Sequence, residues 1–437
     1  MKRNLYEKLL EWRKSVRRKP LLLKGARQTG KTYLLNEFGQ KEYESCIYIN
    51  FERDASAGDF FVDRLDPKEL IKNLSIYVGQ KIRPGRDLIV FDEIQASNRA
   101  LNSLKYFQEQ APEYHIVAAG SLLGITLSGP GSFPVGKVNF LDLYPLSFFE
   151  FLEAVGAKEL KELVQSRQTP EPYPEPLHKE LLRQLRSYYF TGGMPEAVYY
   201  FASSGDWEEV REVHNEILGA YVLDFAKYAA GPDIPKLRMV WDSIPAQLSK
   251  ENKKFIFSVL KKSARMRDFE NAIQWLEKAG LIHRIFRVNT AKRPLKAYAE
   301  ENIFKVYTLD TGLLGALAGI PARILVQGDR IFQEFKGALV ENFVVQELKA
   351  TRGLDLYYWE SRGTAEVDFL CENFDAIFPL EAKAGINPHS KSLKSFDQKF
   401  HPPYLGRTSQ LNFKQDGRLL NIPLYAVSLF PLPPRDG

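Results

Sequence analysis

The chain has 437 residues, of which 44% are hydrophobic, and a formal net charge of +6. This length predicts about three domains, and the composition excludes a mainly disordered, collagen-like or coiled-coil protein. The longest nearly apolar stretch is Ile116 to Leu127, well short of the roughly 20 residues of a membrane helix, so we expect a soluble protein without a membrane partner. The only two cysteines, Cys46 and Cys371, lie far apart, which argues against a disulfide framework and predicts a cytoplasmic location.

Residues 1–150 alternate short apolar runs with helical patterns, which is typical of a parallel α/β sheet. The runs expected to form strands are Leu21–Lys24, Ile47–Phe51, Leu88–Asp92, His115–Gly120 and Val138–Leu141. We therefore predict that the first domain is an α/β domain.

The first expected strand runs directly into a glycine-rich loop. The loop residues, which match the pattern GxxxxGK[ST], are Gly25, Ala26, Arg27, Gln28, Thr29, Gly30, Lys31 and Thr32. Backbone N–H groups of such a loop wrap a triphosphate, because the glycines allow a close approach and the following helix adds positive potential. We predict that all eight residues bind nucleotide, that Lys31 reaches the β- and γ-phosphates as a catalytic residue, and that Thr32 holds Mg²⁺.

Two carboxylates stand at the end of the strand that begins at Leu88. Asp92 is predicted to contact Mg²⁺, and Glu93 to act as the general base that polarises the attacking water. The next strand ends at Ser121, which either senses the γ-phosphate beside the loop or caps a helix; we include it in the nucleotide site. The identity of any arginine finger is left open; Arg99 and Lys137 are candidates on position alone.

Residues 151–235 are expected to hold a linker followed by helices. Four prolines occupy alternate positions between 170 and 176, which neither a helix nor a central strand tolerates. Gln165–Pro176 is therefore predicted to be an exposed, extended linker. A helical pattern over residues 177–230 is interrupted at Gly192-Gly193-Met194-Pro195.

Residues 236–325 contain the basic part of the chain. Lys236–Glu300 has 15 Lys and Arg against 6 Asp and Glu, a charge concentration that favours nucleic-acid binding. A helix over Phe255–Ser263, a second helix over Phe269–Ala279 and a hairpin from Leu281 follow the order of a winged helix. We predict DNA phosphate contacts from residues at the second helix and at the hairpin turn, namely Arg265, Arg267, Lys292 and Arg293. The alternative is a winged helix that binds only other protein domains.

Residues 326–437 return to mixed strands and helices. Asp368 lies in one expected strand, and Glu381 and Lys383 end another, where their i, i+2 spacing places them on one face. This order resembles the restriction-endonuclease-like superfamily, which implies that the carboxylates hold Mg²⁺ and that the lysine orients water or stabilises developing charge. Glu341, in an earlier helical pattern, would add a ligand. The alternative is a domain that keeps this fold only for binding.

Several strings of residues together resemble the prokaryotic AAA+-type ATPases of the archaeal-ATPase-like group. Besides residues 25–32 they are Phe91–Gln95, Ala118–Gly124, Ser132–Lys137, Leu143–Phe148, Thr191–Glu196 and Leu309–Leu313. The resemblance covers nearly the whole chain. It implies a RecA-like core, a small helical lid within residues 151–235, ATP as the nucleotide, and a C-terminal domain of unknown function.

The expected fold is α/β, with a RecA-like P-loop ATPase core, a helical lid, a winged-helix domain and a restriction-endonuclease-like α/β domain. We expect an enzyme that hydrolyses ATP with Mg²⁺ and acts on duplex or branched DNA, with a second copy of the chain as a further candidate partner. Mg-dependent nuclease activity in the C-terminal domain is left open. The alternative function is a nucleotide-controlled interaction protein, such as a defence or regulatory switch, whose nuclease-like domain only binds.

Overall fold

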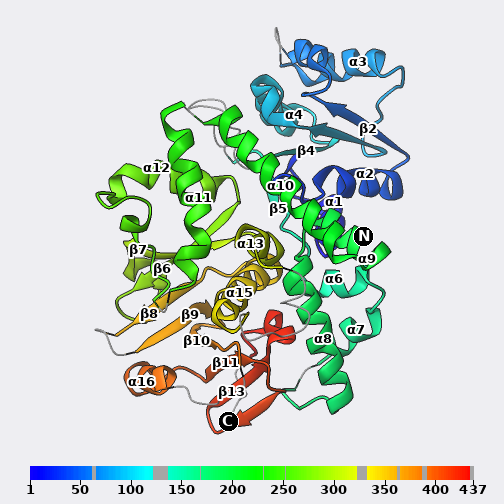
Figure 1. Cartoon of the computed structure of the whole chain (residues 1–437). Coiled ribbons are helices and arrows are strands. Elements are labelled where there is room, and N and C mark those ends of the chain that lie inside the picture. Colours follow the sequence, from blue (N-terminus) through cyan, green and yellow to red (C-terminus); the bar gives the residue numbers. More distant parts are fainter. Residues whose placement is uncertain are drawn as a thin grey trace. The chain divides into compact units, whose positions relative to one another are not determined.

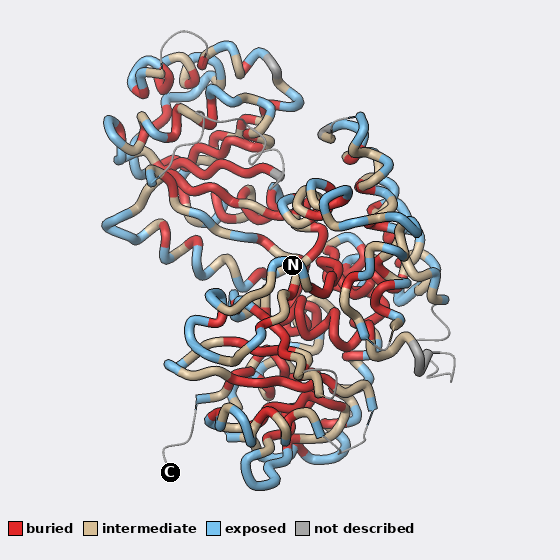
Figure 2. The backbone as a smooth tube through the Cα atoms, turned by 90° about the vertical axis from the view of Figure 1, so that its left-hand side faces the viewer, coloured by how far each residue is buried: buried red, intermediate tan, exposed pale blue. Residues whose placement is uncertain are grey.

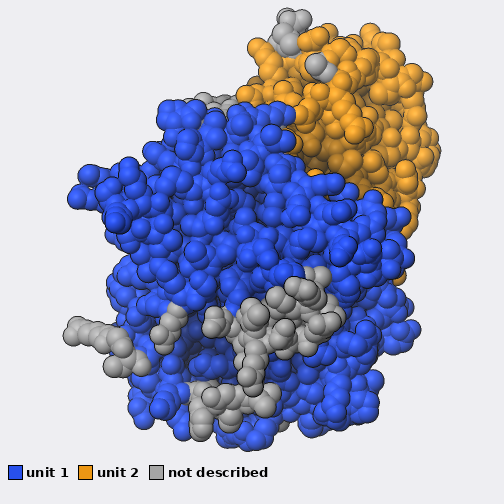
Figure 3. Space-filling view, viewed as in Figure 1, with its two compact units in different colours: residues 1, 145–277, 281–437 blue, residues 2–144, 278–280 orange. Residues whose placement is uncertain are grey.

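The computed structural model describes residues 1–61, 65–121, 136–167, 169–229, 231–250, 252–321, 332–361, 365–385 and 391–433. The chain forms two compact units (Figure 1; Figure 3), one built mainly from residues 2–144 and the other from residues 145–277 and 281–437. The segments expected to be a linker with helices, a winged-helix domain and a C-terminal domain therefore lie within one unit. Within the described ranges, no helix combines the length and apolarity that a bilayer crossing requires.

The N-terminal unit is built on a five-stranded parallel sheet with the strand order β2-β3-β4-β1-β5. The strands are β1 Leu21–Gly25, β2 Ser45–Asn50, β3 Asp87–Asp92, β4 His115–Ser121 and β5 Asn139–Asp142. All five predicted strands and the α/β class of this unit are thus confirmed.

Helices cover both faces of this sheet. They are α1 Leu5–Lys14, α2 Lys31–Glu42, α3 Pro67–Tyr77 and α4 Asn98–Gln110, with the short 3-10 helices η1 Ala55–Phe61 and η2 Ile94–Ala96. Leu21 and Leu23 of β1 pack with α1 and α2, whereas Leu22 between them packs with α3 and α4. Burial on both faces (Figure 2) explains why the three central strands, β1, β3 and β4, are nearly continuous apolar runs. Polar groups are left for the carboxyl ends of the strands, where ligands bind in open parallel sheets.

The second unit begins with helices. They are α6 Phe148–Ala154, α7 Lys158–Gln165, α8 Glu175–Thr191, α9 Pro195–Ser204, α10 Trp207–Tyr228, η3 Gly231–Asp233 and α11 Ile234–Leu248. The predicted interruption after Thr191 is confirmed, and a Cβ atom on Gly193 would lie 2.0 Å from the carbonyl oxygen of Leu146. The predicted linker is only partly exposed, because Tyr173 buries its ring against Phe413 and Tyr425.

An eight-stranded mixed sheet forms the rest of this unit, with the order β12-β13-β11-β10-β9-β8-β6-β7. Its strands are β6 Ile282–Val288, β7 Ala299–Thr308, β8 Tyr357–Glu360, β9 Glu366–Asn373, β10 Ala376–Ala382, β11 Leu405–Ser409, β12 Lys414–Asp416 and β13 Leu419–Pro423. The accompanying helices are η4 Phe257–Val259, α12 Met266–Lys278, η5 Leu295–Tyr298, α13 Thr311–Leu317, α15 Phe332–Glu347, η6 Leu348–Arg352, α16 Lys391–Phe400 and η7 Leu424–Leu429.

The winged-helix prediction needs two corrections. The hairpin expected to be the wing is β6 and β7, and β6 also pairs in parallel with β8, so a domain boundary at residue 325 would cut a continuous sheet. The helix expected over Phe255–Ser263 is only the short η4, preceded by a bridge from Lys254 to Lys305. Local sequence patterns predicted the two strands of the hairpin but not the pairing of β6 with β8, which lies far along the chain. The second expected helix is present as α12.

Several of the sequence motifs meet at one buried carboxylate. Asp310 accepts hydrogen bonds from the backbone N–H groups of Gly193 (2.6 Å) and Leu313 (3.0 Å) and from the side chain of Gln346 (3.1 Å). Burial raises the pKa of Asp310 to about 6. These contacts tie α13 and α15 to the interruption between α8 and α9, so the motif residues 191–196 and 309–313 are explained by packing.

Candidate functional site

The glycine-rich loop between β1 and α2 has the shape that its sequence predicts. Gln28 and Gly30 adopt left-handed backbone conformations, with φ of 63° and 90°. A Cβ atom on Gly25 would lie 2.4 Å from the carbonyl oxygen of Leu143, so only glycine fits there. The Thr29 hydroxyl donates to the carbonyl of Ala26 at 2.9 Å and closes the loop.

Lys31 is the first residue of α2 and lies buried under the loop. Its ammonium donates to the carbonyl oxygens of Gly25 at 3.0 Å and Ala26 at 2.8 Å. Burial lowers the pKa of Lys31 to about 8, although the nearby carboxylates of Glu93 and Asp92 partly offset this effect. Among the described residues, the ammonium has only these two backbone carbonyls as hydrogen-bond partners, and a phosphate group is a stronger acceptor that can replace them.

Asp92, the last residue of β3, brings the second motif to the loop. Its Oδ2 accepts hydrogen bonds from the Thr32 hydroxyl at 2.7 Å and the Tyr48 hydroxyl at 2.5 Å. Glu93 follows in a left-handed conformation with φ of 49°, and its carboxylate accepts a hydrogen bond from Gln95. The structure thus brings together two pairs of neighbouring residues that lie far apart in the sequence, Lys31 with Thr32 and Asp92 with Glu93.

These side chains fit ATP and Mg²⁺. The Thr32 hydroxyl and the Asp92 carboxylate are hard oxygen ligands, as Mg²⁺ requires, and they already lie within one hydrogen bond of each other. The loop supplies backbone N–H groups at the start of α2, where the helix dipole favours phosphate.

Ser121 and Lys137, which were also predicted near the nucleotide, differ in what they contact. The backbone of Ser121 pairs with Gly25 in the sheet, and its side chain lies outside the described residues. Lys137 forms an ion pair with Glu109 at 2.9 Å. Sequence patterns missed Tyr48 and also Arg3, whose guanidinium donates to the carbonyl of Thr29 at 2.9 Å. Neither lies in a recognisable motif.

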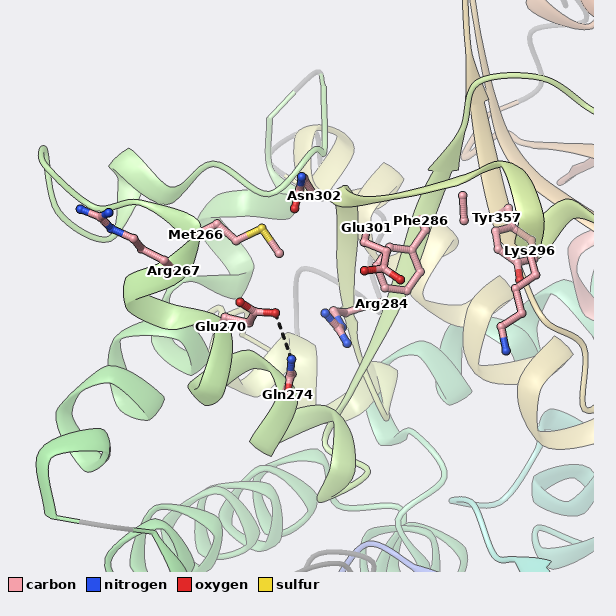
Figure 4. A pocket seen from close by; sticks show the side chains of 11 residues that line it. Met266, Arg267, Glu270, Gln274, Arg284, Phe286, Lys296, Glu301, Asn302 and Tyr357 are labelled. Carbon is pink, nitrogen blue, oxygen red and sulfur yellow. Dashed lines mark hydrogen bonds between the residues drawn. The ribbon is translucent and has the colours of Figure 1, made fainter.

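The DNA-contact candidates fall into two groups. Arg265 and Arg267 are exposed at the start of α12, where Arg267 forms a long ion pair with Asp268 at 3.9 Å. Arg267 is one of the residues that line a groove of about 620 Å³ between α12 and strands of the mixed sheet (Figure 4). Arg293, in contrast, is held against the β9–β10 turn by Asp375 at 2.8 Å and Glu372 at 3.7 Å. Lys292 is exposed beside it.

Much of the positive charge in the basic segment is neutralised within the protein. Arg287 pairs with Glu360, Arg293 with Asp375 and Lys253 with Glu341, and these three carboxylates lie outside the segment. Inside the segment, Arg284 pairs with Glu277 and Arg287 with Glu300. Arg284 also lies in the groove of Figure 4, beside the Phe286 ring. The charge excess seen in the sequence therefore overstates the free positive surface.

The C-terminal candidates lie in one neighbourhood. Asp368 is on β9, Glu381 is on the adjacent β10, and the N–H of Ala382 donates to Asp368 at 2.9 Å. Lys383 pairs with Glu381 at 2.7 Å. Glu341, on α15, is buried and accepts a hydrogen bond from the Tyr307 hydroxyl at 2.7 Å.

Sequence patterns missed two lysines and a further carboxylate of this neighbourhood. Lys253 pairs with Glu341, and the buried Lys305 of β7 pairs with Glu366 of β9. We call the whole set the charge cluster; its members are Lys253, Lys305, Glu341, Glu366, Asp368, Glu381 and Lys383. The pKa of Asp368 is raised to about 7 by burial and by the charge of Glu341, which the lysines only partly offset.

Comparisons with known families agree with the N-terminal geometry. Residues 17–152 match an AAA domain, residues 182–323 match a domain of unknown function, DUF8612, and residues 336–426 match a second, DUF4143. The N-terminal unit is therefore similar to AAA domains, over residues that include the glycine-rich loop, Asp92 and Glu93. A search of curated proteins finds no match to this sequence.

Solved structures similar to this chain include the Walker-type ATPase PABY2304 of Pyrococcus abyssi, with 15% identity, 72% of this chain and 95% of that chain covered, and a TM-score of 0.44. The Orc1 protein of Aeropyrum pernix in complex with DNA has 15% identity, coverage of 72% and 90%, and a TM-score of 0.30. The RuvB branch migration motor of Thermotoga maritima has 14% identity, coverage of 64% and 88%, and a TM-score of 0.31. At such TM-scores these similarities do not establish a common function.

Proposed function

We propose that the chain binds ATP with Mg²⁺ in the glycine-rich loop of its N-terminal unit and hydrolyses it. The observation that carries this proposal is the meeting of Lys31, Thr32, Asp92 and Glu93 at the carboxyl ends of β1 and β3. A bound Mg²⁺ would supply Lewis-acid stabilisation of the phosphate charge.

The residues of the chain have separate tasks in this reaction. The Lys31 ammonium exchanges its two carbonyl partners for phosphate oxygens and stabilises the charge that develops on them. Asp92 and the Thr32 hydroxyl hold the metal, and the Tyr48 hydroxyl keeps the Asp92 carboxylate in place. Glu93, anchored by Gln95, orients a water molecule and accepts its proton.

Two substitutions separate binding from hydrolysis. Lys31→Ala is expected to weaken ATP binding by about 100-fold, because charge-assisted contacts to the phosphates are lost. Glu93→Gln is expected to keep ATP affinity and to lower kcat by about 10²–10⁴-fold, because the amide accepts no proton. Fluorescent-nucleotide titration and ADP release measure the two effects.

The matched control is Lys41→Ala, which removes an exposed lysine from the same helix and its ion pair with Glu37. This variant is expected to bind and hydrolyse ATP like wild type. A Glu93→Gln variant with normal turnover would show that another group is the base.

We infer further that the second unit engages DNA, and that the state of the nucleotide controls this engagement. The exposed arginines at the start of α12 support this function, whereas the internal ion pairs of Arg284, Arg287 and Arg293 restrict the contact surface to fewer residues. Phosphate contacts release counterions, so their number sets the salt dependence of binding.

Reversal of charge at Arg265 and Arg267 to Glu is therefore expected to weaken DNA binding and to flatten its salt dependence, with ATP affinity unchanged. Fluorescence anisotropy with labelled duplex, junction and single-stranded DNA at several salt concentrations measures this effect. Reversal at Arg293, which is already paired, serves as the control and is expected to change the salt slope less. An unchanged affinity in the Arg265/Arg267 variant would favour the nucleotide-controlled interaction protein.

The contacts in the charge cluster support the alternative in which the C-terminal domain binds without cutting. Its three glutamates each pair with a lysine. In the described part of the chain, no group of three or more His, Cys, Asp or Glu side chains is arranged to hold a metal ion. Incubation with Mn²⁺ and linear, circular and junction DNA tests this: cleavage that disappears in Asp368→Ala would restore the nuclease assignment.

A further inference from the structure

The resemblance to restriction-endonuclease-like domains implies a divalent metal at Asp368 and Glu381, and the surroundings of these side chains do not fit one. One oxygen of Glu381 pairs with the Lys383 ammonium at 2.7 Å, and Asp368 accepts a hydrogen bond from the N–H of Ala382 at 2.9 Å. Arg407 lies directly opposite Glu381 on β11. Positive charge already surrounds these carboxylates, so a metal ion would meet cations as well as ligands.

Lys305 is the most deeply placed of the cations. It is 1% exposed, its ammonium bonds to Glu366, and it lies 4.8 Å from the centre of the Tyr358 ring. Burial alone would lower the pKa of Lys305, but the carboxylates of Glu341, Glu366 and Asp368 more than offset this and raise it above its usual range. An isolated buried charge is strongly unfavourable, so this lysine and the carboxylates require one another.

The Glu341 carboxylate, on a helix of this unit, is likewise buried and paired with donors of the protein itself. It is 5% exposed and takes both Lys253 and the Tyr307 hydroxyl as donors. Glu341 itself lies on α15, and its two partners come from β7 and from the segment that follows α11. The cluster therefore links the helices of this unit to its sheet.

We propose that protein ammonium groups, Lys305 foremost, occupy the cation role in the charge cluster, so that the C-terminal domain is assembled without a divalent metal. This inference goes beyond the proposed ATPase activity and does not depend on it. Glu381 retains one buried oxygen without a hydrogen-bond partner within the described structure. A divalent ion at this oxygen would have to displace Lys383 from Glu381, and it would be repelled by the positive charges of Lys305 and Lys253, which act on Asp368.

The first test uses the full, nucleotide-free chain and measures Mn²⁺ binding by electron paramagnetic resonance of the free ion, together with Tm in EDTA and in 1 mM Mn²⁺. Wild type and Asp368→Asn are expected to bind the same amount of Mn²⁺. The Asp92→Asn variant shows how much of the bound Mn²⁺ is held at the ATPase site. One equivalent of Mn²⁺ that is lost in Asp368→Asn but kept in Asp92→Asn would overturn the proposal.

The second test removes the cation. Lys305→Met is expected to lower Tm by about 5 °C or more, because it leaves carboxylates unneutralised. Adding Glu366→Gln to it is expected to recover much of that loss. The matched control is Lys394→Met, at an exposed position of α16 in the same domain, with no change expected. Lys305→Met with the Tm of wild type would overturn the proposal, and if it fails to fold, the Mn²⁺ measurement on wild type decides.

Discussion

Two buried lysines of this chain, Lys31 and Lys305, stand beside carboxylates and are held in opposite ways. In the part of the chain that the structure describes, Lys31 bonds only to backbone carbonyls, and its pKa is lowered to about 8. Lys305 bonds to a carboxylate, and its pKa is raised. The first lysine has partners that a phosphate can replace, whereas the second is satisfied within the protein. A lysine beside acidic residues is thus not a sign of ligand binding until its own partners are known.

The largest expected difference between the two lysines is in stability. In nucleotide-free protein, Lys305→Met is expected to cost about 3–5 kcal/mol, because it leaves a buried carboxylate without its partner. Lys31→Met is expected to change stability by only about 1 kcal/mol, because the lost hydrogen bonds are offset by the removal of a desolvated charge. Urea unfolding followed by circular dichroism measures both, and similar losses would remove the distinction.

A second difference concerns pH. ATP binds the charged form of Lys31, and in the free loop the pKa of that ammonium is about 8. Above this pH, binding requires uptake of a proton, so ATP affinity is expected to fall as the pH rises from 7.5 to 9, by at most about tenfold per unit. Nucleotide titrations of wild type and of Lys305→Met are expected to show the same fall.

In the nucleotide-free protein the same lowered pKa acts in the other direction. The unfolded chain keeps the Lys31 proton to higher pH than the folded chain, so the stability of the unit is expected to rise between about pH 8 and pH 10. The Lys31→Met variant is expected to lack both pH effects. If it retains the fall in ATP affinity, a different group titrates.

The smallest expected effect concerns Tyr48, which positions Asp92. Tyr48→Phe removes the hydroxyl that donates to Asp92 at 2.5 Å and is expected to weaken Mg-dependent ATP binding several-fold, in line with about 1 kcal/mol for one hydrogen bond. Binding measured in EDTA is expected to change less. An equal loss with and without Mg²⁺ would mean that Tyr48 acts on the loop and not on the metal ligand.

The sequence was most informative where local order and chemistry coincide. The strand before the loop, the glycines and Lys31 form one continuous segment, and a second buried strand, β3, ends at Asp92 with Glu93 directly after it. Parallel strands then bring both segments to the same edge of the sheet. Tyr48 escaped prediction because it belongs to neither motif and reaches Asp92 only through the pairing of β2 with β3.

The C-terminal region was less predictable, again because decisive contacts come from segments that lie far apart in the sequence. Asp368, Glu381 and Lys383 were found because two neighbouring strands carry them. Lys305 and Lys253 come from segments more than 60 residues earlier, in what the sequence suggested was another domain. Side-chain charge is visible in a sequence, but its neutralisation by a distant partner becomes visible only once β6 and β7 are placed in the mixed sheet.

The position of β6 in that sheet also affects how the chain folds during synthesis. β6 lies between β7 and β8, and roughly 70 residues separate it from β8 along the chain, which take several seconds to translate at about 5–20 residues per second. During that interval one side of β6 has unpaired N–H and C=O groups, which are prone to pair with other chains. Premature termination after residue 325 is therefore expected to yield an aggregation-prone product, and a fragment of residues 236–325 is expected to aggregate when expressed by itself.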